Sequence, residues 1–167
     1  MRGVVGRCGQ RPWPGLLALC AVLLLAMTDT AKACAVPADA PALREAMNHL
    51  LNAERTAAGL ARLRMSHRIT GAAQSHACSI ARRDDVSHRG ALGGGLRLRL
   101  LRRGYSPGGA AENLAMGLDT APGVVVRWMA SPAHRANVLA RGMRDIGIGV
   151  ARGANGQLYW VAISAHR

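Results

Sequence analysis

The order of two hydrophobic periodicities constrains the fold of this chain most strongly. Over residues 41–59 and again over about 69–83, apolar side chains recur at helical spacing, which predicts two amphipathic helices. Two strand-like runs, 146–151 and 158–163, come near the end, and the segment between them contains an Asn-Gly pair typical of a hairpin. Helices followed by strands, without an alternating βαβ order, predict an α+β fold with a central antiparallel sheet.

Two shorter helices are expected between these elements. Thr120 followed by Pro122 opens one of them, because proline suits the first helical turn, and Ser131-Pro132 ends it. Residues 96–103 alternate leucine with arginine. One interpretation of this segment is a short helix with its leucines inward and its arginines in solvent. The other is a strip that binds a membrane.

The first 33 residues have the composition of a secretory signal peptide. A basic start precedes an apolar run over residues 15–27 and a small-x-small cleavage site, Ala31-Lys32-Ala33. Because spanning a bilayer takes roughly 20 apolar residues, this run is too short to be transmembrane, and we expect no other segment to span a membrane. We predict one domain over residues 34–167 in a secreted protein, periplasmic or extracellular. A lipid anchor on Cys34 is the alternative.

The cysteines indicate one disulfide. Cys8 and Cys20 leave with the signal peptide, so Cys34 and Cys78 remain as an even pair. In an oxidising compartment such a pair forms a disulfide by default. The alternative is that Cys78 is a reactive thiol, activated by the arginines that follow it.

The charge of the chain favours anionic surroundings. The whole sequence carries a formal net charge of +13, and about +10 remains after residues 1–33 are removed, all of its basic side chains being arginine. Such a charge favours an anionic envelope surface as partner, although an arginine-rich composition with no such partner is equally open. Nucleic acid is not expected, because the four aromatic residues beyond the signal are too few for a stacking platform.

Two histidines and one carboxylate stand near Ser, Pro or Gly residues. His88 follows Ser87, Glu112 lies in the segment 111–115, and His134 follows Ser131-Pro132. If they converged in one cleft, these side chains could hold a divalent cation or transfer protons. Their spacing is much longer than that of a compact ligand motif, so it does not by itself establish convergence. His76 falls on the buried stripe of the helix 69–83, and we interpret it as structural.

The order of several short motifs resembles the CAP superfamily, the SCP-like extracellular domain of cysteine-rich secretory, venom-antigen and pathogenesis-related proteins and of small secreted bacterial proteins. The resemblance runs from about Leu43 to Ile163. It implies a three-layer α-β-α sandwich. The segments that carry it, in the family's order, are 51–55, 59–63, 72–77, 87–88, 104–105, 112–114, 128–137 and 145–150.

The resemblance also implies a cleft. Family members commonly carry two histidines and two acidic residues there; His88 and His134 match the histidines and Glu112 matches one acid. Ser131 stands where the second acid is expected. The implied cleft is therefore formed by His88, Glu112, Ser131 and His134. No cofactor is required, and His88 with His134 would be the ligands if Zn²⁺ or another divalent cation were bound, with Glu112 behind them or acting as a general base.

The function that we predict is a binding module and not an enzyme. Its cleft would hold a divalent cation or a small apolar or lipid ligand. The alternative is a metal-dependent hydrolase acting on extracellular peptide or envelope substrates, with Glu112 as the candidate catalytic residue. A purely structural role stays open as well: Glu112 would tie a loop to backbone N–H groups, and Ser131 would cap the helix that follows it.

Overall fold

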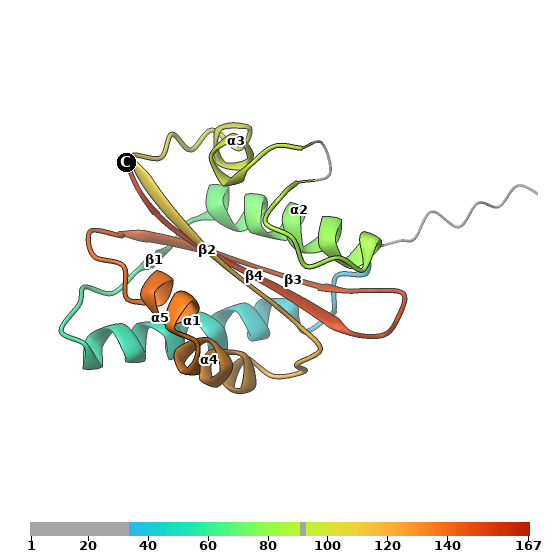
Figure 1. Cartoon of the computed structure of the whole chain (residues 1–167), viewed down its shortest axis with the longest axis horizontal. Coiled ribbons are helices and arrows are strands. Elements are labelled where there is room, and N and C mark those ends of the chain that lie inside the picture. The colour runs from blue at the N-terminus through green and yellow to red at the C-terminus, as the bar shows by residue number, and fades with distance from the viewer. Residues whose placement is uncertain (1–33, 91–92) are drawn as a thin grey trace, which may run out of the picture. The chain divides into compact units, whose positions relative to one another are not determined.

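The computed structural model describes residues 34–90 and 93–167 (Figure 1). The predicted signal peptide, with Cys8 and Cys20, lies outside the described residues. None of the described helices is long and apolar enough to span a bilayer. The elements follow in the order α1 (Ala40–Ala57), β1 (Arg64–Met65), α2 (His67–Arg83), α3 (Leu96–Leu101), β2 (Gly109–Met116), α4 (Ala121–Ala130), α5 (Pro132–Val138), β3 (Asp145–Arg152) and β4 (Leu158–His166).

The four strands form one sheet in the order β1-β3-β4-β2. β4 pairs antiparallel with both β2 and β3, whereas the two-residue β1 pairs parallel with β3. The α+β class is confirmed, but the sheet is mixed and not purely antiparallel. The reason is the connection, because the chain between β1 and β3 crosses over through helices instead of turning back in a hairpin. β2 is left at the outer edge of the sheet.

The helices lie in two layers, one on each face of the sheet. α2 and α3 cover one face, and α1, α4 and α5 cover the other (Figure 1). Each interface has its own apolar core, which confirms the predicted three-layer sandwich. The α2 side buries Ile69, Ile80, Leu100, Tyr105 and Ile163. The opposite side buries Met47, Leu51, Val124, Trp128 and Ile148.

α2 lies unusually close to β3, and glycine makes this approach possible. A Cβ on Gly149 would come within 2.4 Å of the backbone of Ala73, and one on Gly147 within 2.1 Å of the amide nitrogen of Thr70. No side chain fits at either strand position, so the helix rests directly on the strand. His76, one turn beyond Ala73, is thereby held over the sheet, 3.9 Å from Glu112 of β2.

A disulfide joins Cys34 to Cys78 of α2, as predicted. Next to it, Ala35 and Arg152 exchange two backbone hydrogen bonds of 2.7 and 3.3 Å. Together these contacts fasten the start of the described chain to α2 and to the end of β3.

The orientation of α3 differs from the predicted one. Leu98 and Leu101 are exposed, whereas Leu100 is buried and the side chain of Arg99 is only 10% exposed. On a helix, residues separated by three or four positions share a face, so Leu96, Arg99 and Leu100 point inward together. The alternating leucines and arginines of this segment therefore do not divide into an apolar and a charged face of the helix.

Candidate functional site

The candidate site lies along β2, whose outer edge is covered by side chains from α4 and α5. Trp128 Nε1 donates a 3.0 Å hydrogen bond to the Leu114 carbonyl, and Asn137 Nδ2 donates one of 3.1 Å to the Glu112 carbonyl. An edge strand otherwise presents unpaired backbone groups. The segment 128–137 thus satisfies this edge and fixes α4 and α5 against it.

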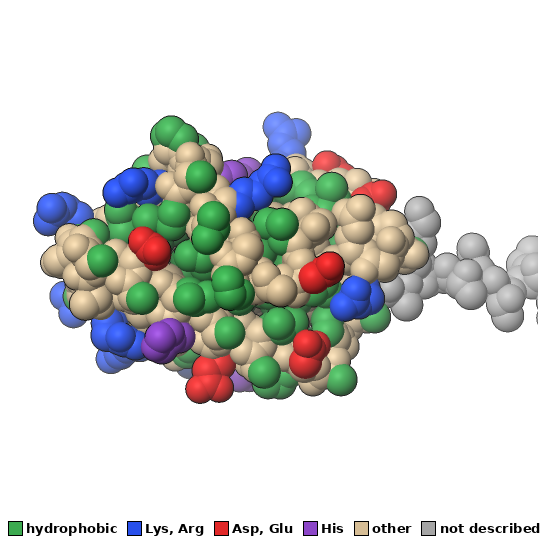
Figure 2. All heavy atoms as spheres, turned by 90° about the horizontal axis from the view of Figure 1, so that it is seen from below, with side chains coloured by type: hydrophobic (Ala, Val, Ile, Leu, Met, Phe, Trp, Pro, Cys, Tyr) green, Lys and Arg blue, Asp and Glu red, His purple; other side chains and the backbone are tan. Residues whose placement is uncertain are grey.

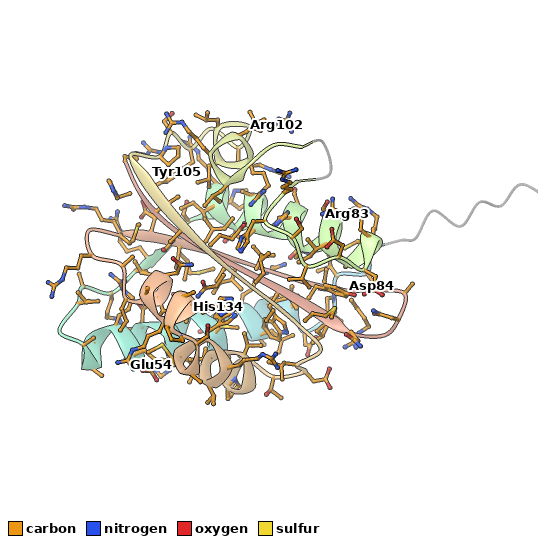
Figure 3. The ribbon with its side chains drawn as sticks, in the orientation of Figure 1. Glu54, Arg83, Asp84, Arg102, Tyr105 and His134 are labelled. Carbon is orange, nitrogen blue, oxygen red and sulfur yellow. A yellow bond between two sulfur atoms is a disulfide. The ribbon has the colours of Figure 1, made fainter. Side chains whose placement is uncertain are left out.

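His134 is positioned through the backbone. Asn113 of β2 donates a 2.9 Å hydrogen bond to the His134 carbonyl, and Asn137 donates one of the same length to the side chain of Asn113. The His134 side chain therefore leaves α5 beside the strand (Figure 3). Asn113, which follows Glu112, and Asn137, three residues after His134, therefore join the two segments of the site.

Glu112 is buried and holds three basic groups from different segments. Its Oε1 accepts a 2.8 Å hydrogen bond from His88 Nδ1, and its Oε2 pairs with the Arg99 guanidinium. His76 Nε2 lies 3.9 Å from Oε1. Because a buried carboxylate is costly without a positive partner, Arg99 is the contact that allows Glu112 to be charged here.

The two site histidines differ in their surroundings. His88 is 64% exposed at its side chain, and its hydrogen bond to Glu112 through Nδ1 leaves Nε2 available. His134 is half-buried; its Nδ1 has no hydrogen-bond partner among the described residues, and its ring lies 6.4 Å from that of Trp128. Burial lowers the pKa of His134, and the nearby His88 and Arg127 lower it further. His134 is therefore neutral at neutral pH.

Both histidines line one cleft of about 380 Å³, which crosses the edge of β2. Its walls come from the loop before α3, from β2 and from α4 and α5. Most of the wall is apolar, and Arg127 adds one positive charge. The remaining lining residues are Val86, Leu114, Ala115, Met116 and Trp128.

The other two predicted cleft residues lie elsewhere. Glu112 stands behind His88 and is not part of the cleft lining, and neither is Ser131. Ser131 occupies the N-cap position of α5, but its side chain makes no capping hydrogen bond, so the capping interpretation is wrong.

The donor set for a metal ion is incomplete. Within residues 34–90 and 93–167, no three His, Cys, Asp or Glu side chains are grouped as ligands of one ion. A cation in the cleft would have the two imidazoles of His88 and His134, with water in its other positions. The protein groups therefore do not fit a closed structural zinc site, which takes four protein ligands.

Arg99 is the site residue that sequence reasoning missed. The alternating polarity of its neighbours predicts an arginine in solvent, and the structure buries it instead. The helical spacing from Leu96 and Leu100 is the signal that could have found it, since this spacing puts Arg99 on the buried face. Its Nη1 also donates a 2.9 Å hydrogen bond to the His88 carbonyl, so one side chain fixes both partners of the His88–Glu112 pair.

Comparisons with known proteins agree with this architecture. The family model described as "Cysteine-rich secretory protein family" (CAP) matches residues 49–164, and the chain belongs to this family. The chain is 29% identical over 113 residues to the uncharacterized protein YkwD of Bacillus subtilis, a match that covers 68% of this chain and 44% of YkwD. The chain thus spans less than half of that relative.

Solved structures share the fold at low sequence identity. An outer surface protein of Borrelia burgdorferi superposes with a TM-score of 0.69 at 19% identity, covering 74% of this chain and 91% of that one. An extracellular protein of Bacillus anthracis that contains an SCP domain gives a TM-score of 0.70 at 20% identity, covering 80% of this chain and 45% of that one. At these identities the likeness establishes the fold alone.

Proposed function

We propose that this CAP protein is a binding module whose cleft at the edge of β2 takes a small ligand with an apolar body and a polar or anionic end. The supporting observation is the cleft itself, with apolar walls around two histidines and Arg127. At about 380 Å³ it falls in the size range of small-molecule sites, and a few polar groups in an apolar wall are what such sites use to orient a ligand.

The rim of the cleft provides the variants that test this function. Val86 and Met116 are 42% and 41% exposed, so changing them leaves the cores intact. We expect dodecanoate, a simple probe with an apolar chain and an anionic end, to bind saturably in titration calorimetry. A Val86→Ser/Met116→Ser variant should bind it several-fold more weakly, because apolar contact is lost.

The matched control is Val36→Ser/Val126→Ser, which removes the same kind of exposed apolar surface outside the cleft lining. This variant should bind dodecanoate as the wild type does. Equal weakening by the two double variants, or no saturable binding to the wild type, would contradict an apolar site in this cleft.

A divalent cation is the second candidate ligand, favoured by the His88–Glu112 hydrogen bond. A carboxylate that accepts from one ring nitrogen orients a histidine with its other nitrogen toward a metal, as in many metal sites. With two protein donors we expect weak, saturable Zn²⁺ binding that is lost in His88→Ala/His134→Ala. Zinc binding that survives this double change in a folded protein would place the ion elsewhere.

The hydrolase alternative has less support. A general base must reach the water that it activates, but Glu112 is 5% exposed and both of its carboxylate oxygens are engaged by His88 and Arg99. The observed contacts instead support a positioning role for Glu112.

We also propose that residues 1–33 direct secretion, in keeping with the extracellular setting of CAP domains. The arginine excess would then attract the protein weakly to anionic envelope surfaces. Figure 2 shows arginines mostly around the margin of the α1–α4 face, not as a continuous basic surface. Retention on acidic wall material should accordingly be weak and should disappear in high salt.

A further inference from the structure

A second cavity, the α2–α3 pocket, shares no lining residue with the cleft, and two of its lining residues, His76 and Arg99, face Glu112. Its volume is about 280 Å³, and α2, α3 and the loop between them form its walls. The side chains that matter for its chemistry are Ser75, His76, Arg82, Arg99, Arg102 and Arg103. Four arginines thus face one small cavity, and none of the described residues that line it is acidic.

The charge of this pocket is largely uncompensated. Arg99 is neutralised by Glu112, and Arg103 donates a hydrogen bond to the uncharged Ser75 hydroxyl. Arg82 and Arg102 are exposed and make no side-chain hydrogen bond or ion pair within the described part of the chain, and Arg102 directly follows α3 (Figure 3). Guanidinium groups stay charged at any physiological pH, so their mutual repulsion favours an anion between them.

Two side chains in the wall of this pocket carry unpartnered nitrogen atoms. His76 is 1% exposed, and neither of its ring nitrogens makes a hydrogen bond within residues 34–90 and 93–167. Arg99 Nε, on a side chain that is 10% exposed, is likewise unpartnered there. Buried polar groups are nearly always satisfied, so these two covered side chains add unpartnered polar atoms to the wall of the pocket.

We propose that the α2–α3 pocket binds a phosphate-type oxyanion, either a free phosphate monoester or the phosphodiester headgroup of an anionic lipid. Phosphate oxygens are acceptors only, which matches a pocket rich in guanidinium and hydroxyl donors. The volume lies just below the range of about 300–1,000 Å³ for drug-sized ligands, so the phosphate group and a small substituent fill it. The inference does not depend on the function of the His88–His134 cleft.

The test uses variants that alter the anion's partners without touching Glu112. Inorganic phosphate is titrated by calorimetry at low salt into the wild type and into Arg82→Gln/Arg102→Gln. Because both arginines are exposed and make no side-chain hydrogen bond or ion pair among the described residues, the variant should stay folded. We expect saturable binding to the wild type and at least about tenfold weaker binding to the variant, as charge-assisted hydrogen bonds are lost.

The matched control is Arg135→Gln/Arg141→Gln, which removes the same net charge outside the pocket. It should bind phosphate like the wild type. The absence of saturable phosphate binding, or an equal loss in both double variants, would overturn the proposal. If Arg82→Gln/Arg102→Gln fails to fold, the amide NMR shifts of the wild type on titration with phosphate replace that comparison. Shift changes confined to residues 75–82 and 94–103 would support the pocket. Shift changes elsewhere would overturn the proposal.

Two further probes separate the sources of the phosphate. Glycerol 1-phosphate stands for a free monoester, and phosphatidylglycerol vesicles, with phosphatidylcholine vesicles as reference, stand for a headgroup. A headgroup site predicts vesicle retention that excess glycerol 1-phosphate displaces and that Arg82→Gln/Arg102→Gln loses. A site for free phosphate esters predicts glycerol 1-phosphate binding with no vesicle retention.

Discussion

Glu112 connects more segments of this molecule than any other charged residue of the site. It pairs with His88 of the loop and with Arg99 of α3, and it approaches His76 of α2, while the strand that carries it forms the edge of the sheet. Its carboxylate therefore joins these segments and holds the His88 side chain in the wall of the cleft.

The first prediction concerns this carboxylate. Glu112→Gln leaves the buried Arg99 without its counter-charge, and breaking a buried pair from one side is costly. We expect the free energy of unfolding to fall by about 3 kcal/mol in urea denaturation. The matched control is Glu45→Gln, at an exposed position of α1, which should change it by less than about 0.5 kcal/mol. Equal effects of the two variants would contradict the structural role of Glu112.

The second prediction follows from His76. Burial lowers its pKa to about 4. Glu112 and the Ser87 carbonyl raise this pKa in part, whereas Arg99 and Arg83 lower it. Because the unfolded chain takes up this proton near pH 6.5 and the folded protein only near pH 4, the unfolded state binds more protons between these values. The free energy of unfolding should therefore fall as the pH falls from 6.5 to 4, by up to about 3 kcal/mol from this group.

This contribution is measured as the difference between the wild type and His76→Gln in urea denaturation across that pH range. His67→Gln, which removes an exposed histidine from the same helix, is the control for the loss of one histidine. If the pH profile of His76→Gln parallels that of the wild type, His76 is not held neutral by burial.

At the scale of elements, the close contact between α2 and β3 positions the whole α2 side of the site. Gly149→Ala would place a methyl group 2.4 Å from the Ala73 backbone, which cannot yield as a flexible side chain can. We expect a loss of about 3 kcal/mol in the free energy of unfolding, the upper end of the usual cost of overpacking. Gly95→Ala, where nothing lies within 4 Å, is the control and should be neutral or slightly stabilising. A tolerated alanine at 149 would contradict the packing of α2 on β3.

The elements also show what the sequence could and could not predict. Periodicity located α1, α2, β3 and β4 to within a few residues, because each has one buried face or is wholly buried. It missed β2, because residues 109–116 contain no β-branched or aromatic side chain and do not alternate apolar with polar residues. It also missed β1, whose two residues are too short to show a period.

The candidate site was predictable to a similar degree. Family resemblance indicated His88, Glu112 and His134, and the structure brings the two histidines to one cleft with Glu112 behind them. The position of Ser131 outside the cleft lining and the inward turn of Arg99 depend on tertiary packing. Neither can be deduced from the order of motifs along the chain.

At the scale of the whole molecule, the Cys34–Cys78 disulfide closes a segment of 44 residues that includes α1 and β1. In the chain-entropy account, a loop of this length stabilises the folded state by about 4 kcal/mol. Cys34→Ser/Cys78→Ser should lose most of this in urea denaturation under non-reducing conditions, and the wild type should lose the same amount when reduced. An unchanged free energy of unfolding in both experiments would contradict a stabilising disulfide.

At the scale of the whole molecule, two separately lined cavities bear on ligand binding: a mostly apolar cleft at the β2 edge and the arginine-lined α2–α3 pocket, whose wall includes Arg99. We propose this cleft as the ligand site of this CAP protein. The most direct measurement is a two-dimensional amide NMR titration of the protein with dodecanoate. Saturable shifts confined to residues 86–88, 114–116, 127–128 and 134 are the predicted result. Shifts confined to the α2–α3 pocket, or no saturable shifts, would contradict the claim.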